Sequence, residues 1–425
     1  MAREDETWLY LLFGAVLLTV AAAAVLSDGV DAIAGVWRLQ VHPARLLNDF
    51  VAIEGAGSAL LNAVLVAAIG LVIVRATGIR LSGPTIAAVF TMFGFGLFGK
   101  TPLNAIPILL GVGIAARLAG KRYRDYILVA LFGTALGPMV TALAVEFALP
   151  VAWAISAALV AGVAIGVVLP AVAYGMLRLH QGYKLYNVGL TCGLIGIFLA
   201  ATLIGIDSPL DPSRFWSVEG SLLQTLLVPA VCLLFAGVAL ITGRRAAFSE
   251  LARIMKRSGR LPSDFMTMEG RSGTLLNMAA IGMLTWGYVF AVGGPFNGPV
   301  LGGIFTAIGF AAFGKHLKNA IPVMAGAVLA TLAYGKGLAL PGPLLAALFV
   351  LTLAPISGEF GWVVGIIAGA LHLTLVEQTG AWHLGLNLYN NGFAGGLTAT
   401  LLVAIIEWVQ NARESRQALS KEHRQ

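Results

Sequence analysis

Long apolar runs separated by short polar loops occupy most of the 425-residue chain. Fourteen of these runs have the length of a helix, at residues 8–27, 58–76, 82–98, 102–118, 126–145, 151–177, 185–207, 222–243, 273–292, 298–314, 319–335, 341–355, 360–377 and 384–408. A helix that crosses a bilayer needs about 20 apolar residues, so five runs are marginal: 82–98, 102–118, 298–314, 319–335 and 341–355. The pattern predicts an all-α polytopic membrane protein that includes re-entrant or broken helices.

The apolar pattern is duplicated, because motifs of the first half of the chain return in the second half. Asp49–Gly55 returns as Asp264–Gly270, 215 positions later, and the same offset relates 98–107 to 313–322. A third block, 180–194, returns at 383–397. Duplicated halves of this size are typical of transporter folds. We therefore expect a first transmembrane repeat at 1–212 and a second at 213–425, with a basic cytoplasmic loop at 244–271 inside the second.

The basic residues indicate how the repeats lie in the membrane. With fourteen crossings and a cytoplasmic N-terminus, 22 of the 27 lysines and arginines fall on the inner side, as the positive-inside rule requires. Each repeat then holds seven segments, and this odd number makes the second repeat start on the opposite side of the bilayer. The sequence therefore predicts two inverted-topology repeats in the cell (inner) membrane, with both termini in the cytoplasm. It leaves open whether 82–118 and 298–335 span or re-enter, because both arrangements place the other loops identically.

Composition narrows the class of protein. Apolar residues make up 58% and charged residues 11% of the chain, whereas a soluble domain carries about 25% charged residues. The formal net charge of +7 is explained by loops that face an anionic leaflet, so nucleic-acid binding is not expected. The two cysteines, Cys192 and Cys232, lie in apolar runs and form no metal or disulfide pattern. No phosphate-binding loop and no metalloprotease motif occurs, and we expect no cofactor and no metal site.

Two lysines mark a break between short apolar runs, one in each half. The string Phe-Gly-Lys, followed by Asn-Ala-Ile-Pro, contains Lys100 and Asn104 in the first half and Lys315 and Asn319 in the second. Glycine and proline around a polar residue end one helix and start another. If the flanking runs re-enter, half-helix N-termini and lysines reach the middle of the membrane and could bind an anionic solute. The alternative, which we favour for the lysines, is that they snorkel at the membrane interface.

A Leu-Tyr-Asn block followed by glycines is the second candidate site. Tyr186–Asn187 and Tyr389–Asn390 place hydrogen-bonding groups at the start of apolar helices, where they could line a solute path. Helix-packing glycine seams and an interfacial aromatic belt explain the glycines and tyrosines equally well, but not the repeated asparagine. His180 and His383, which precede the blocks, and His372, within an apolar run, are interpreted as structural histidines.

Four acids stand just before apolar runs: Asp49 and Glu54 in the first half, Asp264 and Glu269 in the second. A carboxylate in the first turn of a helix complements the helix dipole, which explains one acid in each half. Each pair could instead hold a coupling ion, H⁺ or Na⁺, and both interpretations stay open.

The LYNVGL string and the Gly-Lys-Thr-Pro turn resemble the asparagine–glycine and short-helix motifs of urea-transporter-like proteins, which have two inverted halves around a narrow pore. These strings cover a small part of the chain, and two further segments separate the lysine turn from the Leu-Tyr-Asn block. Over its full length, the chain is similar to an uncharacterised bacterial family of multi-pass proteins known as a domain of unknown function. That similarity implies a membrane location and an internal duplication, but no substrate.

We expect a membrane transporter that moves a small anionic or carboxylate-bearing solute by alternating access where the two repeats meet, with H⁺ or Na⁺ as coupling ion. The closest alternative is a passive channel for a small neutral polar solute such as urea, with the lysines out at the interface. An intramembrane enzyme, which is not expected, would need one asymmetric cluster of His, Asp or Glu, and a scaffold subunit would have a dry, packed interface. The expected partners are the lipid bilayer, the solute and, in a homo-oligomer, further copies of the chain.

Overall fold

The architecture is all-helical. The computed structural model describes residues 4–147, 149–207, 210 and 214–422, which form helices and no strand. Ten segments of this part of the chain are long and apolar enough to cross a membrane. Eight are single helices: α1 (Glu4–Asp28), α3 (Phe50–Ala76), α8 (Val151–His180), α9 (Asn187–Gly205), α10 (Leu222–Gly243), α13 (Arg271–Ala291), α18 (Trp362–Trp382) and α19 (Asn390–Glu422). The all-α polytopic class predicted from the sequence is confirmed.

The other two long segments are interrupted helices in equivalent places of the two halves. The first comprises η1 (Tyr123–Tyr126), α6 (Ile127–Gly133), η2 (Thr134–Leu136) and α7 (Gly137–Val145); the second comprises α16 (Pro341–Phe349), η3 (Val350–Leu353) and α17 (Ala354–Phe360). A proline, Pro138 or Pro355, is the second residue of the last helix of each segment, α7 or α17, where its missing N–H costs least. The run at 341–355 is therefore part of a segment of spanning length and not a marginal one.

Four helices are too short or too central to be ordinary crossings: α4 (Gly83–Gly96), α5 (Pro102–Leu118), α14 (Gly298–Phe310) and α15 (Leu317–Ala333). The 14 residues of α4 rise about 21 Å at 1.5 Å per residue, less than the hydrocarbon thickness of about 30 Å. Every residue of α14 is buried, so this helix packs against protein on all sides. The expected short helices are therefore present in both halves.

Three short helices lie outside the predicted runs: α2 (Val30–Gln40), α11 (Arg245–Ile254) and α12 (Phe265–Met268). The first two are amphipathic, and α11 carries basic residues on a face without buried side chains. They escaped the sequence analysis because a search for long apolar runs does not detect a short helix with one polar face. The basic stretch expected as a loop at 244–271 is thus partly helical.

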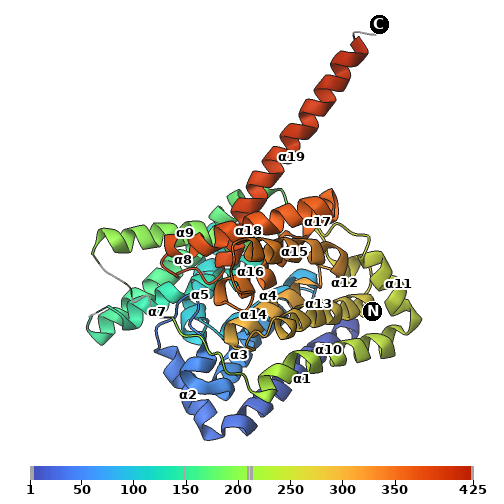
Figure 1. The fold of residues 1–425 in the computed structure, drawn as a ribbon. Coiled ribbons are helices and arrows are strands. Elements are labelled where there is room, and N and C mark those ends of the chain that lie inside the picture. Colours follow the sequence, from blue (N-terminus) through green and yellow to red (C-terminus); the bar gives the residue numbers. More distant parts are fainter. Residues whose placement is uncertain (1–3, 148, 208–209, 211–213, 423–425) are drawn as a thin grey trace.

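The two halves contact each other through equivalent surfaces. Helix α4 packs on α14 and helix α9 packs on α19, and α4 and α14 lie together in the centre of the molecule (Figure 1). Gly189 of α9 meets Gly392 of α19, its counterpart 203 positions later, and a Cβ atom on Gly189 would lie 2.8 Å from the Cα atom of Gly392. When a residue contacts its own counterpart, the contact lies on a two-fold axis.

Two reciprocal hydrogen bonds support the same relation. The Asp49 carboxylate accepts from the N–H group of Gly298, and Asp264, 215 positions after Asp49, accepts from Gly83, 215 positions before Gly298. Contacts of the type i to j and j to i define an isologous interface. The halves are therefore related by an approximate two-fold axis, whereas the boundary expected between 212 and 213 lies outside the described residues.

The C-terminal part of α19 projects away from the helical body (Figure 1). Beyond Val403 this helix has mostly exposed side chains and carries Arg413, Arg416 and Lys421. Its polar end therefore extends out of the apolar layer that the other helices form.

The glycine contact on the two-fold axis gives a test of the fold. Gly189→Leu should lower the free energy of unfolding by about 1–3 kcal/mol, because the added side chain must push α9 from α19. The matched control is Gly237→Leu, since a Cβ atom at this helical position meets no atom within 4 Å. Thermal unfolding of the purified protein in detergent measures both. Equal melting temperatures for the two variants would contradict the arrangement of α9 on α19.

Candidate functional site

A cavity of about 740 Å³ lies between the two halves. Its walls come from α4, η1, α6, α8 and α9 of the first half and from α14, α16 and α19 of the second. Most of the surface is apolar, and five phenylalanine rings line it: Phe95, Phe132, Phe310, Phe313 and Phe349. This volume lies within the range of about 300–1,000 Å³ typical of small-molecule sites.

The two lysines of the helix breaks lie behind this cavity and are completely buried. The exposed fraction of both Lys100 and Lys315 is 0%. The interpretation that they snorkel at the membrane interface is therefore wrong. It failed because each lysine follows a buried helix, α4 or α14, and the lysine stem therefore has no lipid–water boundary to reach.

Each lysine donates a hydrogen bond across the interface between the halves. The Nζ atom of Lys100 bonds to the hydroxyl of Tyr389, and the Nζ atom of Lys315 bonds to the hydroxyl of Tyr186. Both tyrosines line the cavity. A hydroxyl oxygen that accepts from an ammonium keeps its own O–H available as a donor, and neither hydroxyl has an acceptor among the described residues. The lysine–tyrosine pairs therefore present two O–H donors to the cavity.

Aromatic rings surround the ammonium groups. Lys100 Nζ lies 4.6 Å from the centre of the Tyr389 ring, and Lys315 Nζ lies 4.5 Å from the centre of the Tyr186 ring. Each tyrosine also meets a phenylalanine edge to face, Tyr389 with Phe95 and Tyr186 with Phe310. A cation over a desolvated ring is attracted by about 2 kcal/mol. The rings thus replace part of the water that each lysine loses on burial.

Asn104 and Asn319 hold the breaks together and do not line the cavity. Asn104 Oδ1 accepts from the Thr101 N–H group and its Nδ2 donates to the Gly99 carbonyl. Asn319 makes the equivalent bonds with His316 and Gly314. Backbone groups at a break inside an apolar layer need partners within the protein. These bonds give both asparagines a structural role, and solute binding by them stays a prediction.

A second asparagine supports each break from the neighbouring long helix. Asn62 Nδ2 donates to the carbonyls of Gly96 and Lys100 at 2.7 and 2.8 Å. Asn277 does the same for Ala311 and Lys315 at 2.8 and 2.7 Å. The carbonyls freed where α4 and α14 end are thereby satisfied, and the position of each lysine backbone is fixed.

Asn187 and Asn390 are each fixed by a histidine. His180 Nε2 lies 2.9 Å from Asn187 Oδ1, and His383 Nε2 lies 3.1 Å from Asn390 Oδ1. Asn187 lines the cavity, whereas Asn390 does not and its neighbour Asn391 does. The cavity thus brings together Tyr186, Tyr389 and Asn187 of the predicted binding residues.

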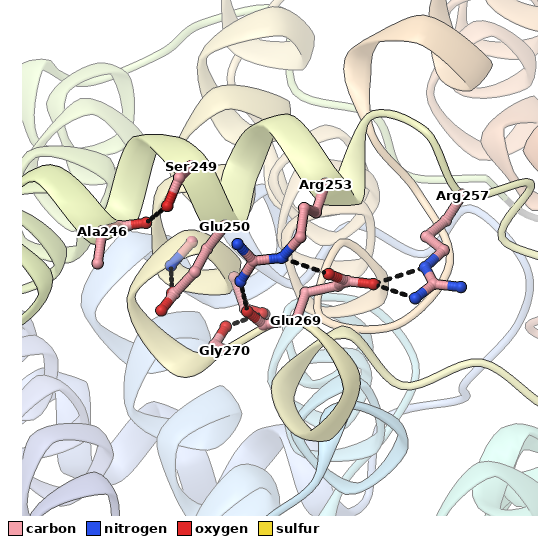
Figure 2. A network of polar contacts seen from close by, with 9 residues as sticks. Ala246, Ser249, Glu250, Arg253, Arg257, Glu269 and Gly270 are labelled. Atoms are coloured by element: carbon pink, nitrogen blue, oxygen red, sulfur yellow. Dashed lines mark hydrogen bonds and ion pairs between the residues drawn. The ribbon is translucent and has the colours of Figure 1, made fainter.

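All four acids have structural partners. Asp49 and Asp264 cap helix N-termini of the opposite half, as described above. Glu54 pairs with Arg38 at 2.7 Å. Figure 2 shows Glu269 between Arg253 and Arg257, at 2.9 and 2.5 Å. These contacts account for the acids as caps and ion pairs; an ion-coupling role for them stays a prediction.

The two ends of the interface differ although their sequences correspond. We call residues 44–49 the first strap and residues 259–264, which lie 215 positions later, the second strap. Both make the same backbone hydrogen bond: the Leu46 N–H group donates to the Gly385 carbonyl, and the Leu261 N–H group donates to the Gly182 carbonyl. Arg45 of the first strap is 4% exposed and pairs with Glu146 at 2.5 Å. Its counterpart in the second strap, Arg260, is half-buried and lies 4.0 Å over the Tyr183 ring. One end is therefore closed by a buried ion pair, whereas Arg260 at the other end forms no ion pair with the described residues.

The cavity opens at the end with the second strap. Its rim contains Leu261, Pro262 and Ser263 of this strap, together with Arg124 and Arg178. No residue of the first strap lines it. The site is thus accessible from one face of the protein, the face with basic loops.

Sequence reasoning missed several residues at the site. The phenylalanines of the walls were not singled out because an apolar run contains many of them and does not show which face a cavity. Two buried residues outside the cavity lining also matter: Lys184, which was not singled out, and His372, which was interpreted as structural; both are 0% exposed. The only sequence signal for Lys184 was a lysine within the duplicated block where the second copy has Asn387. No group of three or more His, Cys, Asp or Glu side chains that could hold a metal ion occurs in the described part of the chain.

The lysine–tyrosine pair gives a stability prediction. Tyr389→Phe should lower the free energy of unfolding by about 1–3 kcal/mol, because Lys100 Nζ loses its hydrogen-bond partner in a buried place. Tyr288→Phe is the matched control, since the Tyr288 hydroxyl is buried without a partner among the described residues. Thermal unfolding in detergent compares them. A loss for Tyr288→Phe as large as for Tyr389→Phe would contradict the importance of the pair.

Of three comparisons with known proteins, one gave a match. The search of curated proteins and the search of solved structures found no match. A family model described as protein of unknown function, DUF1576, matches residues 29–204 and 244–408. The two matched stretches coincide with the bodies of the two halves and together cover most of the chain. The chain therefore belongs to the DUF1576 family.

Proposed function

We propose that this protein is a membrane transporter that carries a small organic anion through the cavity between its halves by alternating access. The observation that carries the proposal is the pair of lysine–tyrosine contacts, one from each half, at the wall of an interface cavity. In transporters with inverted repeats, the solute site lies where the repeats meet and is built from broken helices. The lysine breaks beside α4 and α14 fit that description.

The charge of the site favours an anionic solute. A buried ammonium is costly unless an opposite charge or strong acceptor accompanies it. No ion pair involves Lys100 or Lys315 among the described residues. A carboxylate that accepts from the hydroxyls of Tyr186 and Tyr389 would supply the missing negative charge through charge-assisted hydrogen bonds. The phenylalanine walls suit a solute whose remaining part is apolar.

Two observations support alternating access: the two-fold relation of the halves, and the difference between the two straps. In its described residues, each half holds five long segments and two short ones, so the number of crossings is odd whether the short pair spans or re-enters. Equivalent halves with odd numbers of crossings face opposite sides of the membrane. The closed first strap and the open second strap then correspond to one access state. By the positive-inside rule, the open basic face is cytoplasmic, and both termini share that side of the cell membrane.

Transport assays test the proposal. Proteoliposomes with the purified full-length chain should take up at least one member of a panel of radiolabelled organic carboxylates. Lys100→Ala and Lys315→Ala should each reduce that uptake about tenfold or more, because a charge-assisted bond contributes about 1.5–3 kcal/mol. The control Lys318→Ala removes an exposed lysine of α15 and should transport normally. Uptake of urea without any carboxylate, unchanged in both lysine variants, would instead establish the channel alternative.

Labelling tests the access state. In Ser263→Cys, the new thiol borders the open cavity, so a membrane-impermeant maleimide should modify it from the cytoplasmic face. In Asn48→Cys, the equivalent position of the first strap, the side chain is 1% exposed and should resist modification from either face. Adding Arg45→Gln to Asn48→Cys should speed labelling from the outer face, because it removes the charge that holds Glu146. Equal labelling of both thiols from one face would contradict the asymmetry.

A further inference from the structure

A third lysine is buried in the protein and has no hydrogen-bond partner within the part of the chain that the structure describes. Lys184 is 0% exposed, and its Nζ atom has no hydrogen-bond partner among the described residues. It lies in the turn between α8 and α9, two residues before Tyr186. Unlike Lys100 and Lys315, it therefore has no tyrosine hydroxyl to replace the water that it loses.

Among the described residues, the titratable groups that interact with Lys184 are histidines and a cysteine, without a carboxylate. It interacts electrostatically with His180 of α8, Cys192 of α9 and His372 of α18, and Cys192 also interacts with Lys100. On the side of α19, the neighbour is a glycine: a Cβ atom on Gly396 would lie 2.8 Å from Lys184 Nζ. A charged Lys184 would therefore stand among neutral or cationic groups.

His372 is placed to reach the same space. Its Nε2 atom lies 3.1 Å from Asn391 Oδ1, so the tautomer with the proton on Nε2 satisfies both groups and leaves a lone pair on Nδ1. Nδ1 has no partner among the described residues and lies 3.6 Å from the Cβ position of Gly395. The two adjacent glycines thus face one unpartnered acceptor and one unpartnered amine.

This cluster breaks the symmetry of the halves. The counterpart of Lys184, 203 positions later, is Asn387, and the counterpart of His372, 203 positions earlier, is Leu169. The solute-facing lysine–tyrosine pairs, in contrast, are present twice. A solute site in an inverted-repeat carrier has to serve both access states, whereas one proton site per cycle is sufficient for coupling. The single copy therefore points to a role other than solute binding.

We propose that Lys184 is the proton-coupling site of this carrier, an inference that rests on the transport of an organic anion proposed above. In the empty cavity, Lys184 is a neutral amine, because no negative charge accompanies it. When an anion binds at Tyr186 and Tyr389, a proton from water adds to the Nζ lone pair, and the pair of opposite charges crosses together. After the anion leaves, the N–H bond breaks and the proton returns to water on the other side.

The bound anion and the protonated Lys184 each lower the free-energy cost of burying the other charge. Moving an isolated charge into an apolar interior is far more costly than moving a pair, because a nearby opposite charge replaces part of the lost solvation. The anion and the proton are therefore bound cooperatively, and by linkage the effect is reciprocal. Asn391 lines the cavity and contacts His372, and the His372 ring also interacts electrostatically with Lys184.

The first experiment needs no solute. If the folded protein holds Lys184 as a neutral amine, it binds one proton fewer there than the unfolded chain, so this group makes stability rise with pH. Melting temperatures of the full-length protein in detergent at pH 6 and pH 9 should show a smaller rise for Lys184→Met and Lys184→Asn than for the parent. Lys318→Met, which removes an exposed lysine, should match the parent. An unchanged rise in both Lys184 variants would overturn the proposal.

The second experiment uses benzenesulfonate, an aromatic anion that stays charged and brings no proton of its own. Adding it to the parent in weak buffer should cause uptake of about one proton per bound anion, followed with a pH indicator. Lys184→Met should still bind the anion in calorimetry but take up no proton, and Lys318→Met should behave as the parent. Proton uptake that persists in Lys184→Met would overturn the coupling role. If the parent protein does not bind benzenesulfonate, the anion site proposed above is contradicted. The solute-free experiment still decides whether Lys184 is neutral in the folded protein.

Discussion

The structure depends on hydrogen-bond partners for the backbone groups that are exposed where helices break inside an apolar layer. Where α4 gives way to α5 and α14 to α15, carbonyl and N–H groups lose their helical partners at a place that water does not reach. Asn62 and Asn104 supply those partners in the first half, and Asn277 and Asn319 supply them in the second. Because these amides fix the breaks, each lysine leaves the chain at a defined point and reaches a tyrosine of the other half. The interface cavity follows from that geometry.

Duplication doubles almost every important contact. The helix caps by Asp49 and Asp264, the lysine–tyrosine bonds and the glycine contact of α9 with α19 all have reciprocal forms. In a two-fold arrangement each contact occurs twice, because each half presents the surface that the other half contacts. The differences between the halves are informative for the same reason. They concern the strap ends, where Arg45 and Arg260 have different surroundings, and the unpaired Lys184.

The cavity has apolar walls, and buried lysines lie behind them. Phenylalanine rings exclude water, which strengthens any interaction of a solute with the tyrosine hydroxyls. The same exclusion makes an uncompensated charge costly. The free energy of binding a charged solute therefore depends on the charges of the three buried lysines. An anion with an apolar body is the solute chemistry that satisfies both features at once.

The sequence alone determined the long helices and the duplication, because apolar runs and motifs that return 215 or 203 positions later can be read without knowing any contact. It also located the breaks, because a Gly-Lys pair between two short apolar runs indicates where one helix ends and the next begins. Tertiary structure alone decided the depth of Lys100 and Lys315, the partners of the acids and the neighbours of Lys184. In a membrane protein, an apolar residue satisfies a lipid-facing position and a protein-facing position equally well. The pattern of hydrophobicity therefore shows which segments are helices, but not which side chains of those helices meet each other and enclose the cavity.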